Sequence, residues 1–134
     1  MFVRLIIPTL ALFASCSGYL SSDPIPLPPT EVFDRLCKSL KNQGYKIEIR
    51  DESAGRIVTA WETLLLNEDG TSRRSRVVCN ILPSGKSTVV EVSAPAERSV
   101  MASGTNLLWL PDGSDVEVEE KILTIVRLWR YRAP

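Results

Sequence analysis

The segment 45-YKIEIRDESAGRIVTAWETLLL-66 decides the fold class, because the apolar residues change here from helical spacing to alternation. Tyr45, Ile47 and Ile49 alternate with charged residues, which predicts a strand with one buried face. After a turn, residues 56–66 continue the alternation and are expected to form a second strand. The chain therefore contains at least one antiparallel pair of half-buried strands.

Two further strands are expected on the C-terminal side of this pair. The Asp-Gly pair at positions 69–70 predicts a turn that leads into a third strand over residues 72–82. A second turn at residues 83–86 leads into a fourth strand over residues 87–94. Three short turns between alternating strands predict a four-stranded antiparallel meander.

Amphipathic helices are expected before and after these strands. Thr30 is a candidate N-cap for a helix that begins at Glu31 and stops at Gly44. Its predicted apolar face consists of Val32, Phe33, Leu36, Cys37 and Leu40. Ser114 and Glu117 resemble a capping box that opens a second helix. The apolar stripe of that helix is Val118, Ile122, Ile125, Val126 and Trp129, with Glu119, Glu120 and Lys121 expected outside.

The order helix, four strands, helix predicts an α+β fold. Two amphipathic helices most simply cover one face of a single sheet. We therefore expect a two-layer sandwich, in which a four-stranded antiparallel meander is covered on one face by an N-terminal and a C-terminal helix. Residues 95–111 fit three conformations: a fifth strand, one helical turn, or a loop packed under the last helix.

The start of the chain has the pattern of a secretory signal peptide. Arg4 precedes an uncharged, mainly apolar run over residues 5–14, and small residues stand before Cys16. This run is shorter than the ~20 apolar residues that span a bilayer. The junction Phe13-Ala14-Ser15-Cys16 resembles the lipobox of bacterial lipoproteins, with Phe13 where that family usually has Leu. The alternative is an ordinary signal peptide that is cleaved near Ala14 or Gly18.

The resemblance to bacterial lipoproteins implies an address for the mature protein. Residues 1–15 would be removed, and the thiol of Cys16 would carry diacylglyceryl and further acyl groups such as palmitate. Ser17, where an Asp would be the inner-membrane retention signal of enteric bacteria, implies the periplasmic face of the outer membrane. Residues 16–29 are rich in proline and are expected to be an extended tether. Residues 30–134 are expected to form a single α+β domain.

Composition argues against several classes of function. The chain has 16 basic and 16 acidic residues, and this balance argues against a nucleic-acid partner. The absence of histidine removes the Ser-His and Cys-His nucleophile pairs and the commonest zinc ligand. No metal-ligand spacing and no glycine-rich phosphate loop occur, so we expect a non-enzymatic protein with no catalytic residues, no metal and no cofactor.

Cys37 and Cys79 remain as an even pair once Cys16 is assigned to the lipid. An oxidising compartment favours a disulfide between them. The alternative is that both are small buried hydrophobic side chains. Spacing along the sequence does not decide between these two expectations.

Two clusters are candidates for binding. The basic stretch Arg73, Arg74 and Arg76 would suit an acidic partner, but such a run more commonly forms the solvated face or the protected edge of a sheet. The apolar cluster Leu107, Leu108, Trp109 and Leu110 has no periodic face that requires burial. If exposed, it would be a site for a protein partner; the alternative is a loop folded over the core.

The expected chain resembles the BamC type of accessory lipoprotein of the outer-membrane β-barrel assembly machinery. The resemblance lies in the lipidated cysteine, the proline-containing segment and the small helix-sheet-helix module. This resemblance implies a membrane-anchored, non-enzymatic interaction module in envelope assembly or in a secretion system, with a protein partner in the cell envelope. The alternative function is a carrier or sensor that binds a small ligand between sheet and helices.

Overall fold

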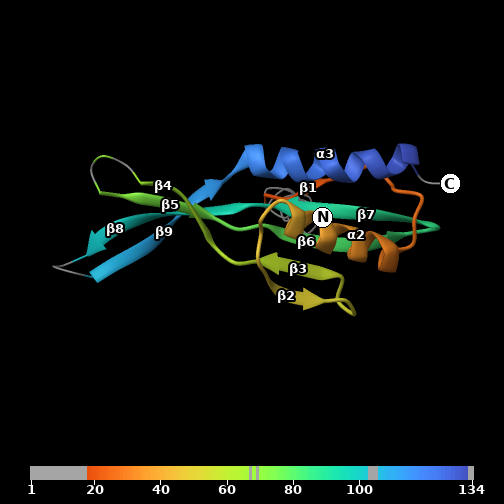
Figure 1. Cartoon of the computed structure of the whole chain (residues 1–134), viewed down its shortest axis with the longest axis horizontal. Helices are drawn as coiled ribbons and strands as arrows, with labels where there is room; N and C mark the ends of the chain where they lie inside the picture. Colours follow the sequence, from red (N-terminus) through yellow and green to blue (C-terminus); the bar gives the residue numbers. More distant parts are fainter. Residues whose placement is uncertain (1–17, 67, 69, 103–105, 133–134) are drawn as a thin grey trace, which may run out of the picture.

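The computed structural model describes residues 18–66, 68, 70–102 and 106–132. These residues form nine strands and two helices, in two antiparallel sheets (Figure 1). The part that we call the body contains α2 (Pro29–Asn42), α3 (Val116–Arg132) and a five-stranded sheet in the order β1 (Leu20–Ser21), β7 (Ser87–Ser93), β6 (Val78–Ser84), β3 (Arg56–Thr59) and β2 (Ile47–Asp51). The part that we call the arm is a four-stranded sheet in the order β4 (Glu62–Leu66), β5 (Ser72–Ser75), β8 (Pro95–Ala102) and β9 (Asn106–Ser114).

The mixed helix-and-strand class and the antiparallel pairing are confirmed, but the single four-stranded meander is wrong. The predicted strands over residues 56–66 and 72–82 are each divided between body and arm. The predicted strand over residues 87–94 is β7, and the chain continues from it into β8. The segment 95–111 fitted three conformations; its described residues, 95–102 and 106–111, lie in the paired strands β8 and β9. The strands thus extend well beyond the part of the sheet that the helices cover.

The two sheets separate where a side chain replaces a backbone partner. Thr59 is the last residue of β3 and is fully buried. Its Oγ1 accepts a hydrogen bond of 2.8 Å from the N–H of Val77, and its own N–H donates to the Val77 carbonyl at 3.0 Å. Because a buried N–H must have a partner, the Thr59 hydroxyl allows the strand to break between β5 and β6 without leaving a donor unpaired.

A second buried side chain supports the break between β7 and β8. Glu119 was expected on the outside of the last helix, yet only 2% of its surface is exposed. Its Oε2 accepts a hydrogen bond of 2.9 Å from the N–H of Ala94, the residue between the two strands. The predicted cap at Ser114 is also wrong, because Asp115 Oδ1 accepts from the N–H of Val118 at 3.3 Å. The start of α3 is therefore tied to the point where the sheet divides.

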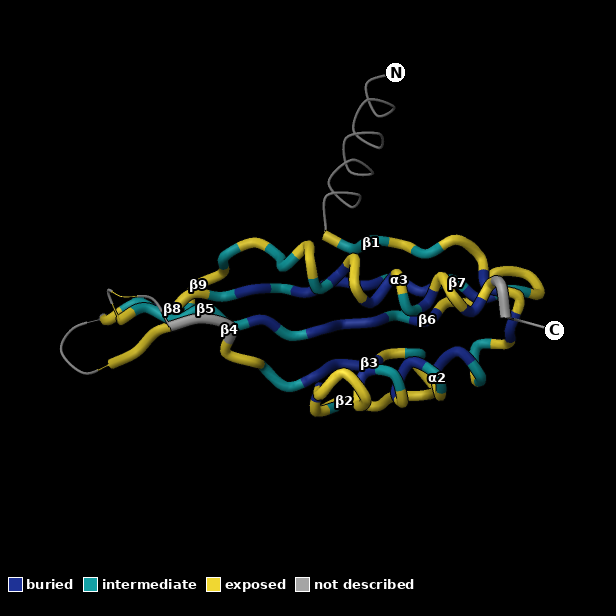
Figure 2. The backbone as a smooth tube through the Cα atoms, turned by 45° about the horizontal axis from the view of Figure 1, so that its top comes forward, coloured by how far each residue is buried: buried dark blue, intermediate teal, exposed yellow. Residues whose placement is uncertain are grey.

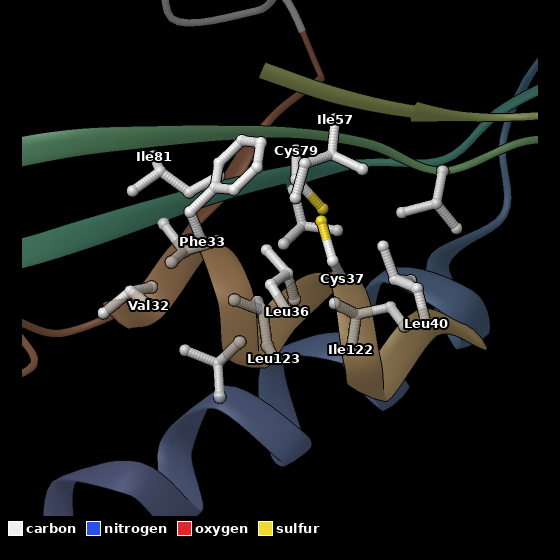
Figure 3. Packing of buried hydrophobic residues seen from close by; sticks show 14 of the residues in the cluster. Val32, Phe33, Leu36, Cys37, Leu40, Ile57, Cys79, Ile81, Ile122 and Leu123 are labelled. Atoms are coloured by element: carbon white, nitrogen blue, oxygen red, sulfur yellow. The ribbon is translucent and has the colours of Figure 1, made fainter. Parts of the chain in front are cut away.

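The core lies between the two helices and one face of the body sheet (Figures 1 and 3). The predicted apolar face of α2 is confirmed, because Val32, Phe33, Leu36, Cys37 and Leu40 are all buried. The helix begins at Pro29 rather than Glu31, since Pro28 is the N-cap and proline suits a first turn. From the other side the core receives Ile122, Leu123, Val126 and Trp129 of α3, and from the sheet Ile57, Cys79, Ile81, Val90 and Val92.

The expectation that residues 16–29 form a tether outside the core is wrong for the part that the structure describes. Leu20 and Ser21 form β1, the edge strand of the body sheet, and pair with β7. Ile25 forms a bridge with Thr88, and Ile25 and Leu27 are 0% and 5% exposed within the hydrophobic core. Proline favours an extended chain, but the apolar residues between the prolines bury enough surface to fix that chain against the domain.

Cys37 on α2 and Cys79 on β6 are free thiols whose sulfur atoms point toward each other in the core (Figure 3). Burial, together with the charge of a neighbouring Cys37 thiolate, raises the pKa of Cys79 to about 12. Burial also raises the pKa of Cys37. Both thiols are therefore protonated at neutral pH, and bridging stays a prediction for the exported protein.

We expect Ile25→Ala to lower the free energy of unfolding by about 2–4 kcal/mol, because it leaves a cavity in a closed core. Pro26→Ala is the matched control at an exposed neighbour and should change stability by less than about 1 kcal/mol. Urea titration of both variants checks this. Equal effects would show that residues 24–27 do not pack as described.

In an oxidising compartment we expect the chain to carry a Cys37–Cys79 disulfide, seen as the loss of two hydrogens by mass spectrometry. After reduction, Cys79 has a pKa of about 12 in the folded chain and about 9 in the unfolded chain. Above pH 9 the unfolded chain therefore releases a proton that the folded chain retains, and stability falls. The reduced protein should lose about 1.4 kcal/mol between pH 8 and pH 10. The bridged form should lack this loss, and Cys79→Val should keep only the part that comes from Cys37; an equal slope in all three would contradict the burial of the Cys79 thiol.

Candidate functional site

The arm is the part of the structure that the helices leave uncovered (Figure 1). Buried residues are concentrated in the body, whereas the outer half of the arm is mainly exposed or half-buried (Figure 2). Among the described residues, none on the four arm strands belongs to the hydrophobic core cluster. The shape of the arm must consequently be held by backbone pairing and by contacts between surface side chains.

The end of the arm exposes large apolar side chains. Met101 on β8 is 69% exposed, and Leu107, Leu108 and Leu110 on β9 are 51%, 49% and 38% exposed. Three of the four predicted partner-binding residues therefore lie at the surface, and the alternative of a loop folded over the core is excluded. Apolar side chains gathered in this way are typical of a binding surface.

The apolar residues lie on both faces of the hairpin. The cross-strand pairs are Arg98–Leu110, Ser99–Trp109, Val100–Leu108, Met101–Leu107 and Ala102–Asn106. Because paired residues share a face and neighbours alternate, Leu108 and Leu110 lie on one face. Leu107 and Trp109 lie on the other, together with Met101. A ligand that covered only one face would leave half of this apolar surface in water.

Trp109, the fourth predicted residue, is half-buried and has a different role. Its ring lies 4.1 Å from Cζ of Arg74, and the ring of Trp61 lies 4.5 Å from the same atom. A second arginine, Arg76, also contacts Trp61, and its Cζ lies 4.5 Å from the centre of the Trp61 ring. Glu97 Oε1 accepts hydrogen bonds from Nε and Nη2 of Arg74 at 2.9 and 2.6 Å. We call these five residues the arginine–tryptophan stack.

The stack fixes the base of the exposed patch. A guanidinium group between two indole rings gains about 0.5–2 kcal/mol per cation–π contact, depending on its exposure. The Arg74 and Glu97 side chains are only about one quarter exposed, so their ion pair is better protected than a pair at an open surface. On the opposite face, Arg73 pairs with Asp112 at 3.1 Å. Trp109 therefore anchors β9 while its leucine neighbours remain available.

The sequence contained a signal for the stack that was not recognised. The turn predicted from the Asp-Gly pair implies that the strand after Trp61 pairs with the strand of Arg74, and a register counted from that predicted turn brings the tryptophan close to the arginines. The observed pairing of β4 with β5 has this register, with Thr63 opposite Arg74. The basic stretch was instead expected to be a solvated face or a protected edge. Met101 was missed because one methionine among small polar residues gives no periodic signal.

Little else in the described residues suggests chemistry. No group of three or more His, Cys, Asp or Glu side chains could hold a metal ion among the residues that the structure describes. Within the same residues, no helix is long and apolar enough to cross a membrane. A groove of about 200 Å³ between the N-terminal segment and α3 is lined by Asp23, Ile25, Arg127 and Arg130, among others. Asp23 and Arg130 form an ion pair there at 3.1 Å.

Comparison with known proteins finds no family model that matches the chain and no curated protein that matches its sequence. The residues of the arm therefore have to be interpreted from their own geometry.

We expect Arg74→Lys to lower the free energy of unfolding by about 1–2 kcal/mol, because lysine keeps the charge but loses the planar contact with both rings. Arg73→Lys is the matched control: its ion pair is more exposed and lacks a ring, so the loss should stay below about 1 kcal/mol. Tryptophan fluorescence during urea unfolding reports both values. A loss in Arg73→Lys as large as that in Arg74→Lys would show that the rings contribute nothing.

Proposed function

We propose that this chain is a lipid-anchored, non-enzymatic interaction module that binds a protein partner of the cell envelope through its arm. Its anchor is Cys16, at the periplasmic face of the outer membrane, and its role lies in envelope assembly or in a secretion system. The single observation that carries the proposal is the arm itself, which extends beyond the core and exposes Leu107, Leu108 and Leu110. Apolar side chains in such a position cost solubility unless a partner covers them.

Cys16 lies outside the described residues, but the domain begins close to it. Leu20, four positions later, is already fixed to β7. Four extended residues reach about 14 Å at most. The body of an anchored chain would therefore lie directly beside the membrane. The arm, rather than a flexible tether, would then supply the reach toward a partner.

The body offers less support for a carrier of small ligands. The space between the helices and the sheet is filled by side chains of the core, including Phe33, Leu36 and Ile122. A ligand of ordinary size needs a pocket of about 300 Å³ or more with an apolar lining. The body has an open hollow of about 300 Å³ beside the start of α2, lined by Phe33, Ile81 and Leu82 among others, but it lies outside the packed space between helices and sheet. The arm exposes the apolar cluster Met101, Leu107, Leu108 and Leu110, so we propose the arm as the binding surface.

The test replaces Leu107 by a photo-crosslinking amino acid in the full chain in cells. We expect a crosslinked product from position 107 and none from position 128, since Leu128 is equally exposed on α3 but lies on the body. Identification of the molecule that is crosslinked to position 107 must show that it is a protein. The product should decrease strongly in Cys16→Ser, because the chain is then no longer concentrated at the membrane.

Labelled fatty acid gives an independent reading of the anchor. Incorporation should be lost in Cys16→Ser and retained in Cys37→Ser, which removes a buried thiol instead. Incorporation that persists in Cys16→Ser would refute the anchor. Equal crosslinking from positions 107 and 128 would refute the arm as the binding surface while leaving the anchor intact.

A further inference from the structure

The two sheets have four edge strands, and three of them are protected from pairing with another chain. Edge strands expose unpaired N–H and C=O groups, and natural proteins protect them by shortness, charge or bulges. β1 has only two residues. β2 contains Glu48, Arg50 and Asp51, and its register shifts between Ile47 and Ile49. β4 begins with Glu62, and its register shifts between Thr63 and Leu65.

β9 is the edge strand that lacks this protection. It is nine residues long, and from Asn106 to Pro111 it contains no charged residue. Its pairing with β8 is regular from Ala102–Asn106 to Glu97–Pro111, and the register shift lies beyond, at the base of the arm. Pro111 is compatible with this position, because an edge strand tolerates a residue without an N–H. The outer part of β9 is thus a regular, uncharged edge.

We propose that β9 binds an extended segment of its partner as a fifth strand of the arm, so that the partner continues the sheet. The inference rests on the proposed function and specifies how the arm acts. An added strand pairs with the backbone of β9 and places its side chains on both faces of the sheet. β9 suits such a strand in two ways. Its backbone edge is regular, and it exposes apolar side chains on both faces, Leu108 and Leu110 on one and Leu107 on the other.

The same faces define the chemistry of the bound segment. Its central residues are uncharged and apolar on both faces, to cover the leucines and Met101. Arg98 adds one charge requirement, because among the described residues it is the arginine on the arm strands that has no acidic partner. It lies opposite Leu110 on one face. A partner residue beside Leu110 would be about 10 Å from Arg98, two strand spacings, which a Glu and an Arg side chain bridge.

This charge argues against a second copy of the chain as the occupant. A copy that paired through its own β9 would offer Asp112 as the acid of that strand, and Asp112 already pairs with Arg73. The backbone groups of β9 also argue against burial in lipid, because an open sheet edge does not enter the hydrocarbon of a bilayer. The geometry points to an extended, apolar segment of another protein with one acidic residue.

The test measures hydrogen exchange on the full lipidated chain, reconstituted at one copy per lipid nanodisc. The probe is a capped peptide with Val at its central positions, Thr at its ends and one Glu. We expect it to protect alternate backbone amides of β9, since the intervening amides are already paired with β8. The control peptide has the same side chains but carries N-methyl groups on the alternate amides that would pair with β9. Because these groups block strand pairing, it should protect β9 about tenfold less at the same concentration.

Variants of the protein complete the test. Leu108→Lys should weaken binding of the peptide about tenfold, because a lysine on an edge strand opposes pairing. Leu128→Lys, an equally exposed leucine on α3, should not change binding. Replacing the Glu of the peptide by Lys should weaken binding about threefold at low salt and less at high salt.

Three results would overturn the inference. Equal protection by the N-methylated peptide would mean that the leucines bind the peptide by apolar contact alone, without an added strand. In that case the arm would still be the binding surface of the proposed function. Protection, before any peptide is added, of the β9 amides that are not paired with β8 would identify the membrane as the occupant. Protection that appears only when a nanodisc holds two copies would identify a second copy of the chain.

Discussion

The structure depends on what happens to two backbone N–H groups at the point where the sheet divides. The N–H of Val77 donates to the hydroxyl of Thr59, and the N–H of Ala94 donates to the carboxylate of Glu119. Both donors would otherwise be buried without a partner, at a cost of about 1–3 kcal/mol each. Because these side chains satisfy them, the strands leave the helix-covered body and continue as a separately paired sheet. The arm therefore depends on two polar side chains inside an otherwise apolar region.

The arm and the body are stabilised by different physics. In the body, apolar side chains of α2, α3 and the sheet form one cluster from which water is excluded. The described residues of the arm strands contribute nothing to that cluster. The arginine–tryptophan stack takes its place, with Arg74 held between two rings and against Glu97. Planar groups stacked in this way restrict motion without needing burial on all sides. An arm built like this keeps a defined shape while both faces of its outer half remain in contact with water.

The sequence predicted those features that arise from periodic burial. The face of α2 follows from the spacing of apolar residues, and the structure confirms it. The structure also confirms strands at β2 and β3, but not the alternating burial, because Ile49 is 46% exposed and three consecutive residues of β3 are buried. The division of the sheet could not be predicted in this way, because side chains keep alternating across the break at Thr59 while the backbone changes partners. Glu119 was placed outside because a carboxylate in a helix is usually solvated; its burial depends on a donor far away in the sequence. The proline-rich segment was assigned by composition, which ignored Ile25 and Leu27. In the candidate site, the apolar run in β9 was identified, whereas the role of Trp109 depends on a register that spacing within one strand does not reveal.

The packing of the N-terminal segment has a consequence for how an anchored chain explores its surroundings. With Leu20 paired to β7 and Ile25 in the core, the segment moves with the body from Leu20 on, only four positions after the proposed attachment point at Cys16. An anchored chain would then drift in the plane of the bilayer with its body close to the lipid surface, and the tip of the arm would stay within a limited range of heights. Encounters would be restricted to a thin layer parallel to the lipid surface, and the direction of approach would be set before contact. A flexible linker would instead let the tip of the arm move through a larger volume, without a restricted height or a preferred direction of approach.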